Sequence, residues 1–296
     1  MGRKEVVMTV EEAASMVRDG MTISIGGILT ANHPMAIIRR IIKNGVKNLT
    51  VVGSPAAGLE IDLMIGAGVV RKVATAYVGG ESLAPIGPFF RWAAVEGKVQ
   101  VWECDEAILC TALRAAAEGL PFLPWLGGVG TCLPEINPEL KYFEDPIRGQ
   151  KLLAVPAMEI DVAILHASWG DPYGNIQYVG NTYADILMAR AAKKCIFQVE
   201  KVVSNEEVKR NPYLTKISGV DAVVPAPYGS HPFSSDGFYG LDKEHLKEYV
   251  AAARASVKGD PEPFNQYLRK YVLEPESHED YLEKIGIKRL LSLYKY

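Results

Sequence analysis

The stretch Asp19–Pro34, DGMTISIGGILTANHP, contains the features that indicate the fold of this 296-residue chain. The β-branched run Thr22–Ile25 follows a turn and predicts a buried strand. Gly26 and Gly27 come next, and the closing proline suits the first turn of a helix. Glycines at a strand end allow close backbone approach, and their N–H groups could face a carbonyl or carboxylate oxygen. A tight turn without a ligand also accounts for the pair.

The same alternation of strand and helix continues along the chain. Further strands are predicted at Leu49–Val52, Lys72–Ala76, Val99–Glu103, Val162–His166, Lys194–Val199 and Asp221–Val224. Helices are predicted at Val10–Val17, Pro34–Lys43, Glu106–Glu118 and Asn181–Ala192. Such alternation predicts an α/β fold with an open, mostly parallel sheet and helices on both of its faces.

Two segments stand apart from this pattern. Leu120–Gly149 is rich in proline and glycine, and we expect it to form a long excursion over the carboxyl edge of the sheet, where open α/β folds place ligands. The residues from about Ser256 onward are charged and helical in pattern. We therefore divide the chain into an α/β domain, residues 1–255, and a C-terminal helical extension, residues 256–296, that packs on the domain or on a partner.

Composition narrows the functional classes. Charged residues make up 23% of the chain, the formal net charge is −3, and lysines and arginines are scattered, so neither nucleic acid nor a membrane is expected as partner. The four cysteines form no Cys-x-x-Cys pair, which argues against a metal site and fits a cytoplasmic protein without disulfides. We find no signal peptide and no run of 18 apolar residues. Phosphate-binding and common hydrolase motifs are also absent from the sequence.

Several blocks of sequence resemble one family, the class I coenzyme A (CoA) transferases, and in particular their α subunits. Besides the opening stretch, in which Ile28 and Asn32 depart from the usual pattern, they are DLMIGAGVVRKV from Asp62, AAAEGLPFLP from Ala115, AVPAMEIDVAILHASWGDPYGN from Ala154, AAKKCIFQVEKVVSNEEV from Ala191, DAVVPAPYGSHPFSSDGFYG from Asp221 and HEDYLEKIGIKRLLSL from His278. Together they cover nearly the whole chain. They most closely resemble the α-type chain of glutaconate CoA-transferases, and nearly as well the α subunit of a related CoA hydrolase that opens a steroid-derived ring.

This resemblance implies a fold of the NagB/RpiA/CoA transferase-like type and a heterodimer or heterotetramer with the active site between subunits. CoA would act as a cosubstrate, with no permanently bound cofactor, and acyl-CoA and a carboxylic acid would be the substrates. In the family a glutamate in a Ser-Glu-Asn/Ser-Gly motif attacks the acyl-CoA and later carries CoA as a thioester. This sequence lacks that motif. We therefore expect the nucleophile on a separate β subunit.

The resemblance and the strand ends together suggest substrate contacts. Ser54, Gly80 and Ser82 lie in loops that follow predicted strands, and Gly130-Thr131 resembles the Gly-Thr loop of the family. The N–H groups of that loop could bind a carboxylate or a CoA phosphate, although a plain flexible loop explains it equally. His231, after the last predicted strand, could contact a substrate carboxylate or shape the subunit interface, or it could belong to a turn whose polar groups cap the backbone.

Glu106 is the candidate catalytic residue of this chain. A carboxylate in the first turn of a helix is commonly structural, because it complements the helix dipole. The ring-opening hydrolases, however, resemble this stretch, with an Asp-Glu pair at the same place and the glutamate as their proposed catalytic group. Glu106 could then activate water as a general base. Three functions remain open: CoA transfer, acyl-CoA hydrolysis, and a non-catalytic ligand-sensing role.

Overall fold

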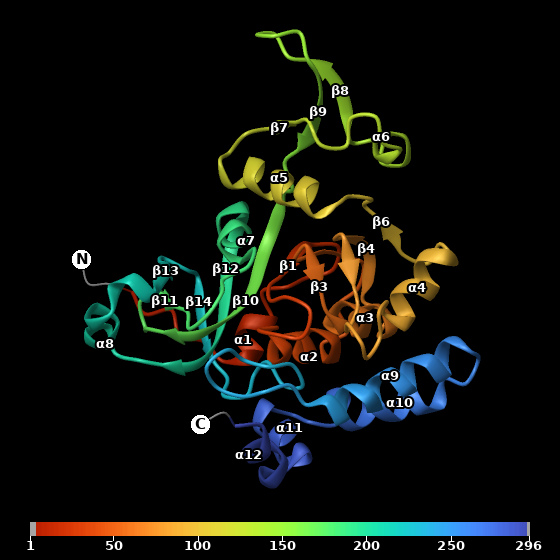
Figure 1. The fold of residues 1–296 in the computed structure, drawn as a ribbon. Coiled ribbons are helices and arrows are strands. Elements are labelled where there is room, and N and C mark those ends of the chain that lie inside the picture. The colour runs from red at the N-terminus through yellow and green to blue at the C-terminus, as the bar shows by residue number, and fades with distance from the viewer. Residues whose placement is uncertain (1–3, 295–296) are drawn as a thin grey trace.

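The computed structural model describes residues 4–294. Over these residues nine strands form the main sheet, whose parallel part has the order β14-β12-β10-β1-β2-β4-β6 (Figure 1). Its strands are β1 (Thr22–Ile25), β2 (Leu49–Gly53), β4 (Val70–Ala74), β6 (Gln100–Val101), β10 (Ile160–Gly170), β12 (Ala192–Val202) and β14 (Ala222–Pro225). The short strands β11 (Ile176–Gln177) and β13 (Thr215–Ile217) join antiparallel at the end of β10. The predicted open, mostly parallel sheet is confirmed.

Helices cover both faces of this sheet. One face packs against α1 (Val10–Ala14), α2 (Met35–Lys43), α3 (Leu59–Gly66) and α4 (Pro88–Val95), and the other against α5 (Glu106–Ala117) and α7 (Asp185–Ala191). Because side chains alternate along a strand, Val51 belongs to the first core cluster and its neighbour Val52 to the second.

Helices α3 and α4 were not predicted from the sequence. In α3 every residue from Leu59 to Ile65 is buried, including Glu60 and Asp62. A helix that is buried all round has no polar stripe, so the 3.6-residue periodicity that reveals surface helices is missing. The predicted helix α5, by contrast, buries one face and exposes the other.

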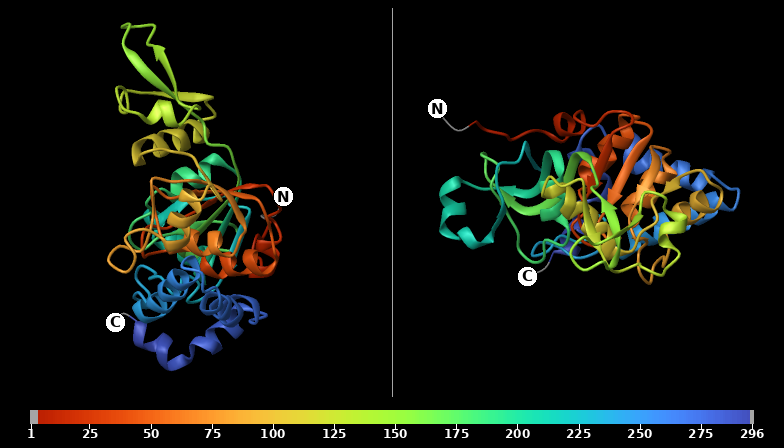
Figure 2. Two further views of the ribbon diagram at one scale, coloured as in Figure 1. Left: turned by 90° about the vertical axis from the view of Figure 1, so that its right-hand side faces the viewer. Right: turned by 90° about the horizontal axis from the view of Figure 1, so that it is seen from above.

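The Pro- and Gly-rich excursion contains more regular structure than its sequence suggested. It includes β7 (Phe122–Trp125), α6 (Leu133–Ile136) and β8 (Lys141–Glu144), and β9 (Lys151–Pro156) completes a small antiparallel sheet in the order β7-β9-β8. We call this sheet the arm. It projects from one end of the molecule, opposite the C-terminal helices (Figure 2). The Asn137 side chain ties the arm to the main body by donating to the Glu103 carbonyl at 2.8 Å.

The remaining elements are short or lie in the C-terminal part. They are the paired strands β3 (Ala56–Ala57) and β5 (Tyr77–Val78), α8 (Asn205–Arg210), the 3₁₀ turn η1 (Pro212–Leu214), α9 (Lys243–Val257), α10 (Glu262–Leu268), the π-helical turn η2 (Arg269–Leu273), α11 (His278–Ile285) and α12 (Ile287–Leu293). None of the helices between residues 4 and 294 has the length and apolarity that crossing a membrane requires.

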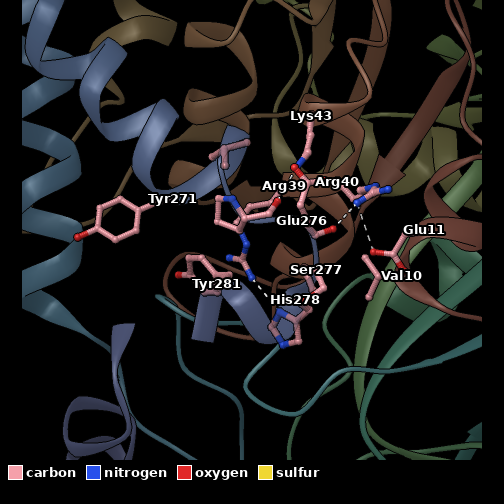
Figure 3. A pocket seen from close by; sticks show the side chains of 13 residues that line it. Val10, Glu11, Arg39, Arg40, Lys43, Tyr271, Glu276, Ser277, His278 and Tyr281 are labelled. Atoms are coloured by element: carbon pink, nitrogen blue, oxygen red, sulfur yellow. Dashed lines mark hydrogen bonds and ion pairs between the residues drawn. The ribbon is translucent and has the colours of Figure 1, made fainter. Parts of the chain in front are cut away.

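The C-terminal helices pack on α2 of the same chain. Lys43 and Arg40 of α2 donate to the carbonyls of Pro275 and Glu276, at 2.6 and 2.7 Å. A cavity of about 20 Å³ lies between α1, α2 and the tail, the C-terminal residues from Tyr271 onward (Figure 3). Because α9 runs through residue 255, the expected boundary falls inside its last turn. The division into domain and extension stays a prediction.

Candidate functional site

The ends of four neighbouring strands bring most of the predicted site residues to one edge. β1, β2, β4 and β6 are adjacent and parallel, so their carboxyl ends lie at the same edge of the sheet. The loops that follow also touch, since Leu29 N–H donates to the Ala56 carbonyl at 2.9 Å and Gly79 N–H to the Ala57 carbonyl at 3.3 Å. The predicted residues on this edge are Gly26, Gly27, Ser54, Gly80, Ser82 and Glu106.

The Gly26–Gly27 turn is held by the protein itself. Gly26 N–H continues the sheet by donating to the Ile164 carbonyl at 3.0 Å. Gly27 N–H donates to the Asp185 carboxylate at 3.2 Å, 158 residues further along the chain. Gly27 has φ +91°, a conformation that glycine adopts readily and other residues rarely adopt. Both N–H groups of the turn are therefore occupied within the chain.

A buried acid and a buried imidazole lie beneath this turn. His33 Nδ1 lies 3.0 Å from the Gly26 carbonyl and 3.5 Å from the Glu60 carboxyl, and neither side chain is more than 1% exposed. Burial raises the pKa of Glu60 to about 8 and lowers the pKa of His33 to about 4. At neutral pH this pair is therefore a protonated acid beside a neutral ring, although the distance alone would allow a salt bridge.

A second buried acid faces the same turn from α7. Asp185 is fully buried, and burial raises its pKa to about 7, against the opposing effect of hydrogen bonds from Tyr178 and Gly27. The Tyr178 hydroxyl donates to Asp185 at 2.9 Å. The carboxyl edge of β1 thus contains two acids, Glu60 and Asp185, whose proton is released at or above neutral pH. Such perturbed acids are commoner at functional sites than elsewhere.

The hydroxyl of Ser54 is a polar group on this edge with an unused hydrogen-bonding capacity. Ser54 is 1% exposed, and its Oγ has no hydrogen-bond partner among the residues that the structure describes. Its backbone carbonyl accepts from the Thr75 hydroxyl at 2.6 Å, which fixes the loop after β2. An unpaired buried hydroxyl costs about 1–3 kcal/mol, so a ligand atom that reached it would recover that free energy.

The loop from Gly79 to Gly87 contains the next two candidates. Gly80 is buried, and its N–H donates to the Ala84 carbonyl at 2.7 Å. Ser82 is exposed, as is Glu81 beside it, which has φ +52°. A non-glycine residue in this left-handed conformation is uncommon and costs of order 1–3 kcal/mol, so the surrounding structure holds the turn in place.

Glu106 begins α5, but its neighbour performs the capping. The Asp105 carboxylate accepts from Ile108 N–H at 2.6 Å. Glu106 is exposed and forms no hydrogen bond or salt bridge with any residue in the described part of the chain. Asp105 therefore provides the capping hydrogen bond, and Glu106 lies in the first turn, where its carboxylate can complement the helix dipole.

The Gly130–Thr131 loop of the arm lies beside this end of α5. A Cβ atom placed on Gly128 would be 3.5 Å from the Ile108 side chain, in the first turns of α5. Thr131 folds back on the same loop, and its hydroxyl donates to the Gly128 carbonyl at 2.7 Å. Both Gly130 and Thr131 are exposed. The loop therefore packs against α5 at the buried residue Ile108, whereas Glu106 lies on the exposed side of the same helix.

His231 is the candidate that the structure places elsewhere. Its ring is fully buried, with Nδ1 2.6 Å from the Tyr281 hydroxyl and Nε2 3.1 Å from the Asp242 carboxylate. Burial lowers the pKa of His231, and the bond to Asp242 opposes that shift. Asp242 also binds Arg289 of α12. His231 therefore joins the C-terminal helices to the loop after β14.

Sequence reasoning missed His33, Glu60 and Asp185. The sequence feature that could have indicated His33 was its place directly before Pro34 in the glycine-containing stretch. Glu60 and Asp62 interrupt an apolar run, which is unusual in a chain segment that buries itself completely. In residues 4–294 there is no group of three or more His, Cys, Asp or Glu side chains placed to hold a metal ion.

Comparison with known proteins identifies the class. The family model described as coenzyme A transferase matches residues 7–226, and the chain belongs to that family. The A subunit of glutaconate CoA-transferase from Acidaminococcus fermentans is 34% identical, over 97% of this chain and 94% of that one. A cholesterol ring-cleaving hydrolase IpdA subunit of Mycobacterium tuberculosis is 35% identical, over 90% and 93%. The crystal structure of the A. fermentans transferase superposes with a TM-score of 0.91 at 33% identity, covering 98% and 96%. The resemblance drawn from the sequence is confirmed.

Proposed function

We propose that this chain is the α subunit of a two-subunit CoA transferase that moves CoA from an acyl-CoA to a carboxylic acid. One observation supports this most directly. The chain is similar over nearly its whole length to the A subunit of a glutaconate CoA-transferase, yet it lacks the Ser-Glu-Asn/Ser-Gly motif of the family's nucleophile. The nucleophilic glutamate would then come from a β subunit, and activity would depend on that partner.

The proposed reaction divides one difficult exchange into covalent steps. The partner's carboxylate attacks the thioester carbonyl and forms a mixed anhydride, releasing the CoA thiolate. The thiolate then attacks the glutamyl carbonyl, giving a glutamyl thioester and the free acid. A second carboxylate then attacks the glutamyl thioester and releases the CoA thiolate, which attacks the new anhydride. This step gives the second acid as its CoA thioester and restores the glutamate. In this scheme the edge with Gly26, Gly27, Ser54, Gly80 and Ser82 would face the partner and position the acyl group.

The test is reconstitution. The chain would be expressed alone and together with a β subunit, and CoA exchange would be measured from acetyl-CoA or glutaconyl-CoA to a carboxylate acceptor. We expect exchange only in the complex. Robust transfer by the isolated chain would contradict the proposal, because this sequence offers no nucleophile of the family type.

Hydrolysis is the second candidate, and Glu106 is the observation that favours it. Its carboxylate is exposed at the start of α5 and makes no hydrogen bond or salt bridge within residues 4–294. One relative is named as a subunit of a ring-cleaving hydrolase. A free carboxylate at the sheet edge could take a proton from an attacking water as a general base.

The substitution Glu106→Gln in the complex separates the two functions. A catalytic Glu106 predicts a fall in turnover by a factor of about 10²–10⁴, the usual contribution of a positioned acid–base group. The matched control is Glu103→Gln, which removes another exposed carboxylate from the same connection. If Glu106→Gln and the control both exchange CoA at the wild-type rate, the hydrolase proposal is wrong and transfer remains.

A further inference from the structure

A groove between α4 and α9 combines positive charge with exposed apolar surface. Its volume is about 760 Å³, within the range of small-molecule and cofactor sites. The two helices pack side by side at one edge of the molecule (Figure 1). The residues that decide its chemistry are Ile86, Arg91, Trp92, Glu96, Arg254 and Lys258.

The charge of the groove is positive although the chain as a whole is negative. Arg91, Arg254 and Lys258 line it against one carboxylate, Glu96. Within residues 4–294 no salt bridge joins any of the three cations to an acid, and Arg254 makes only a long contact of 3.4 Å to the Leu83 carbonyl. Unpaired cations gathered in a concave surface attract anions. The formal net charge of −3 makes this local excess distinctive.

The same groove exposes an aromatic and an aliphatic wall. Trp92 is 41% exposed and Ile86 is 50% exposed. An indole face can stack on a planar base, and arginine side chains can bind phosphate with several N–H groups at once. A ligand that binds both the cationic side chains and the Trp92 ring contains phosphate groups and an aromatic ring in one molecule. A nucleotide has that chemistry.

We propose that this groove binds the 3′-phosphoadenosine diphosphate end of coenzyme A, an inference that rests on the CoA-dependent function proposed above. The groove and the candidate site share one loop. Pro85 and Ile86 line the groove and belong to the Gly79–Gly87 loop, whose Leu83 carbonyl contacts Arg254. The other end of that loop holds Gly80 and Ser82. The pantetheine arm of CoA would follow this loop from the groove to the carboxyl edge of the sheet.

The test uses two variants, Arg254→Ala and Lys258→Ala, each in the complex of this chain with its β subunit. Both side chains are exposed at the end of α9, so neither change removes buried packing. The matched control is Lys247→Ala on the same helix, where the lysine pairs with Glu244 at 2.8 Å outside the groove. Binding of adenosine 3′,5′-bisphosphate is measured by calorimetry, and KM is measured for acetyl-CoA, acetyl-dephospho-CoA and acetyl-pantetheine.

We expect each groove variant to weaken bisphosphate binding and to raise KM for acetyl-CoA about tenfold, the effect of losing one charge-assisted contact. KM for acetyl-pantetheine and the value of kcat should stay unchanged, and the control should behave as wild type. Unchanged bisphosphate binding in both variants would overturn the proposal. So would a variant whose subunits dissociate on dilution while CoA binding in the intact complex is normal, because the groove would then hold the partner protein.

The readouts also separate this inference from the proposed function. A complex that binds the bisphosphate through Arg254 and Lys258 but transfers no CoA refutes the transferase proposal and supports the groove. A complex that transfers CoA with equal KM in wild type and variants refutes the groove alone.

Discussion

Replacing Gly27 with alanine should destabilise the fold far more than the loss of one glycine usually does. The sequence left two interpretations of the Gly26–Gly27 pair, a ligand-facing loop and a tight turn. The atoms around Gly27 favour the second. A Cβ atom there would lie 2.6 Å from the Ala31 carbonyl oxygen and 2.7 Å from that of Asn32, and both are backbone atoms that cannot rotate away.

The magnitude follows from two separate costs. Holding alanine at φ +91° costs of order 1–3 kcal/mol, and forcing extra volume into a closed turn typically costs a further 1–3 kcal/mol. We expect a total of about 4 kcal/mol. At about 2–4 °C per kcal/mol for a chain of this size, the melting temperature should fall by roughly 8–16 °C.

Gly20→Ala is the matched control. Gly20 has φ +77°, but a Cβ atom there would meet nothing within 4 Å, so this variant measures the backbone strain alone. Thermal unfolding followed by calorimetry gives both values. If Gly27→Ala melts within about 2 °C of Gly20→Ala, the turn has room for a side chain and the reasoning fails, since the extra volume would then cost only about 1 kcal/mol or less.

Three further predictions concern buried charge. Glu60→Gln should gain stability relative to wild type as pH rises from about 4.5 to 8, because the folded chain keeps a proton on Glu60 that the unfolded chain releases. Denaturant unfolding of both proteins at several pH values measures this difference in stability. A difference that stays constant with pH would contradict the prediction. His278, with a pKa lowered to about 4, should favour the folded state above pH 6.5 and lose that contribution as pH falls toward 4, so His278→Gln should flatten the acid limb of the stability profile. Arg39→Met should destabilise the chain by about 2 kcal/mol and expose the tail to limited proteolysis. The reason is that the Arg39 guanidinium lies 3.5 Å from the Tyr281 ring centre and donates to the His231 carbonyl. An unchanged cleavage pattern would argue against a role for Arg39 in holding the tail.

The sequence predicted the positions of the parallel strands because each contains a β-branched run beside a turn, although β10 and β12, with 11 residues each, extend beyond the predicted bounds. β1 has the predicted bounds, Thr22–Ile25, and α5 begins at Glu106 as expected. The arm was harder, because in β7 and β8 exposed and half-buried residues are mixed with prolines and charges, and three short strands are recognisable only once they pair. Local pattern carries no information about such pairing.

The candidate site was predicted as a set of strand ends, but not as an electrostatic environment. That environment depends on contacts between distant segments. Asp185 reaches Gly27 across 158 residues, and His33 approaches Glu60 only because α3 folds beneath the Gly26–Gly27 turn. His231, by contrast, was predicted as a site residue and is enclosed by the C-terminal part of the chain. Its turn-like sequence gave no sign that Tyr281 and Asp242 would enclose it.

The division of labour between Asp105 and Glu106 has a consequence for how such a protein can diverge. Asp105 holds the start of α5, and Glu106 is exposed with no internal partner in residues 4–294. A codon change at position 106 would therefore alter the chemistry offered to a substrate while leaving the helix intact. Natural selection could test acidic and neutral side chains there without first compensating for a weakened fold. Position 106 is then a place where a new reaction can arise by a single step, at a structural cost of no more than the helix-dipole contribution of about 0.3–1 kcal/mol.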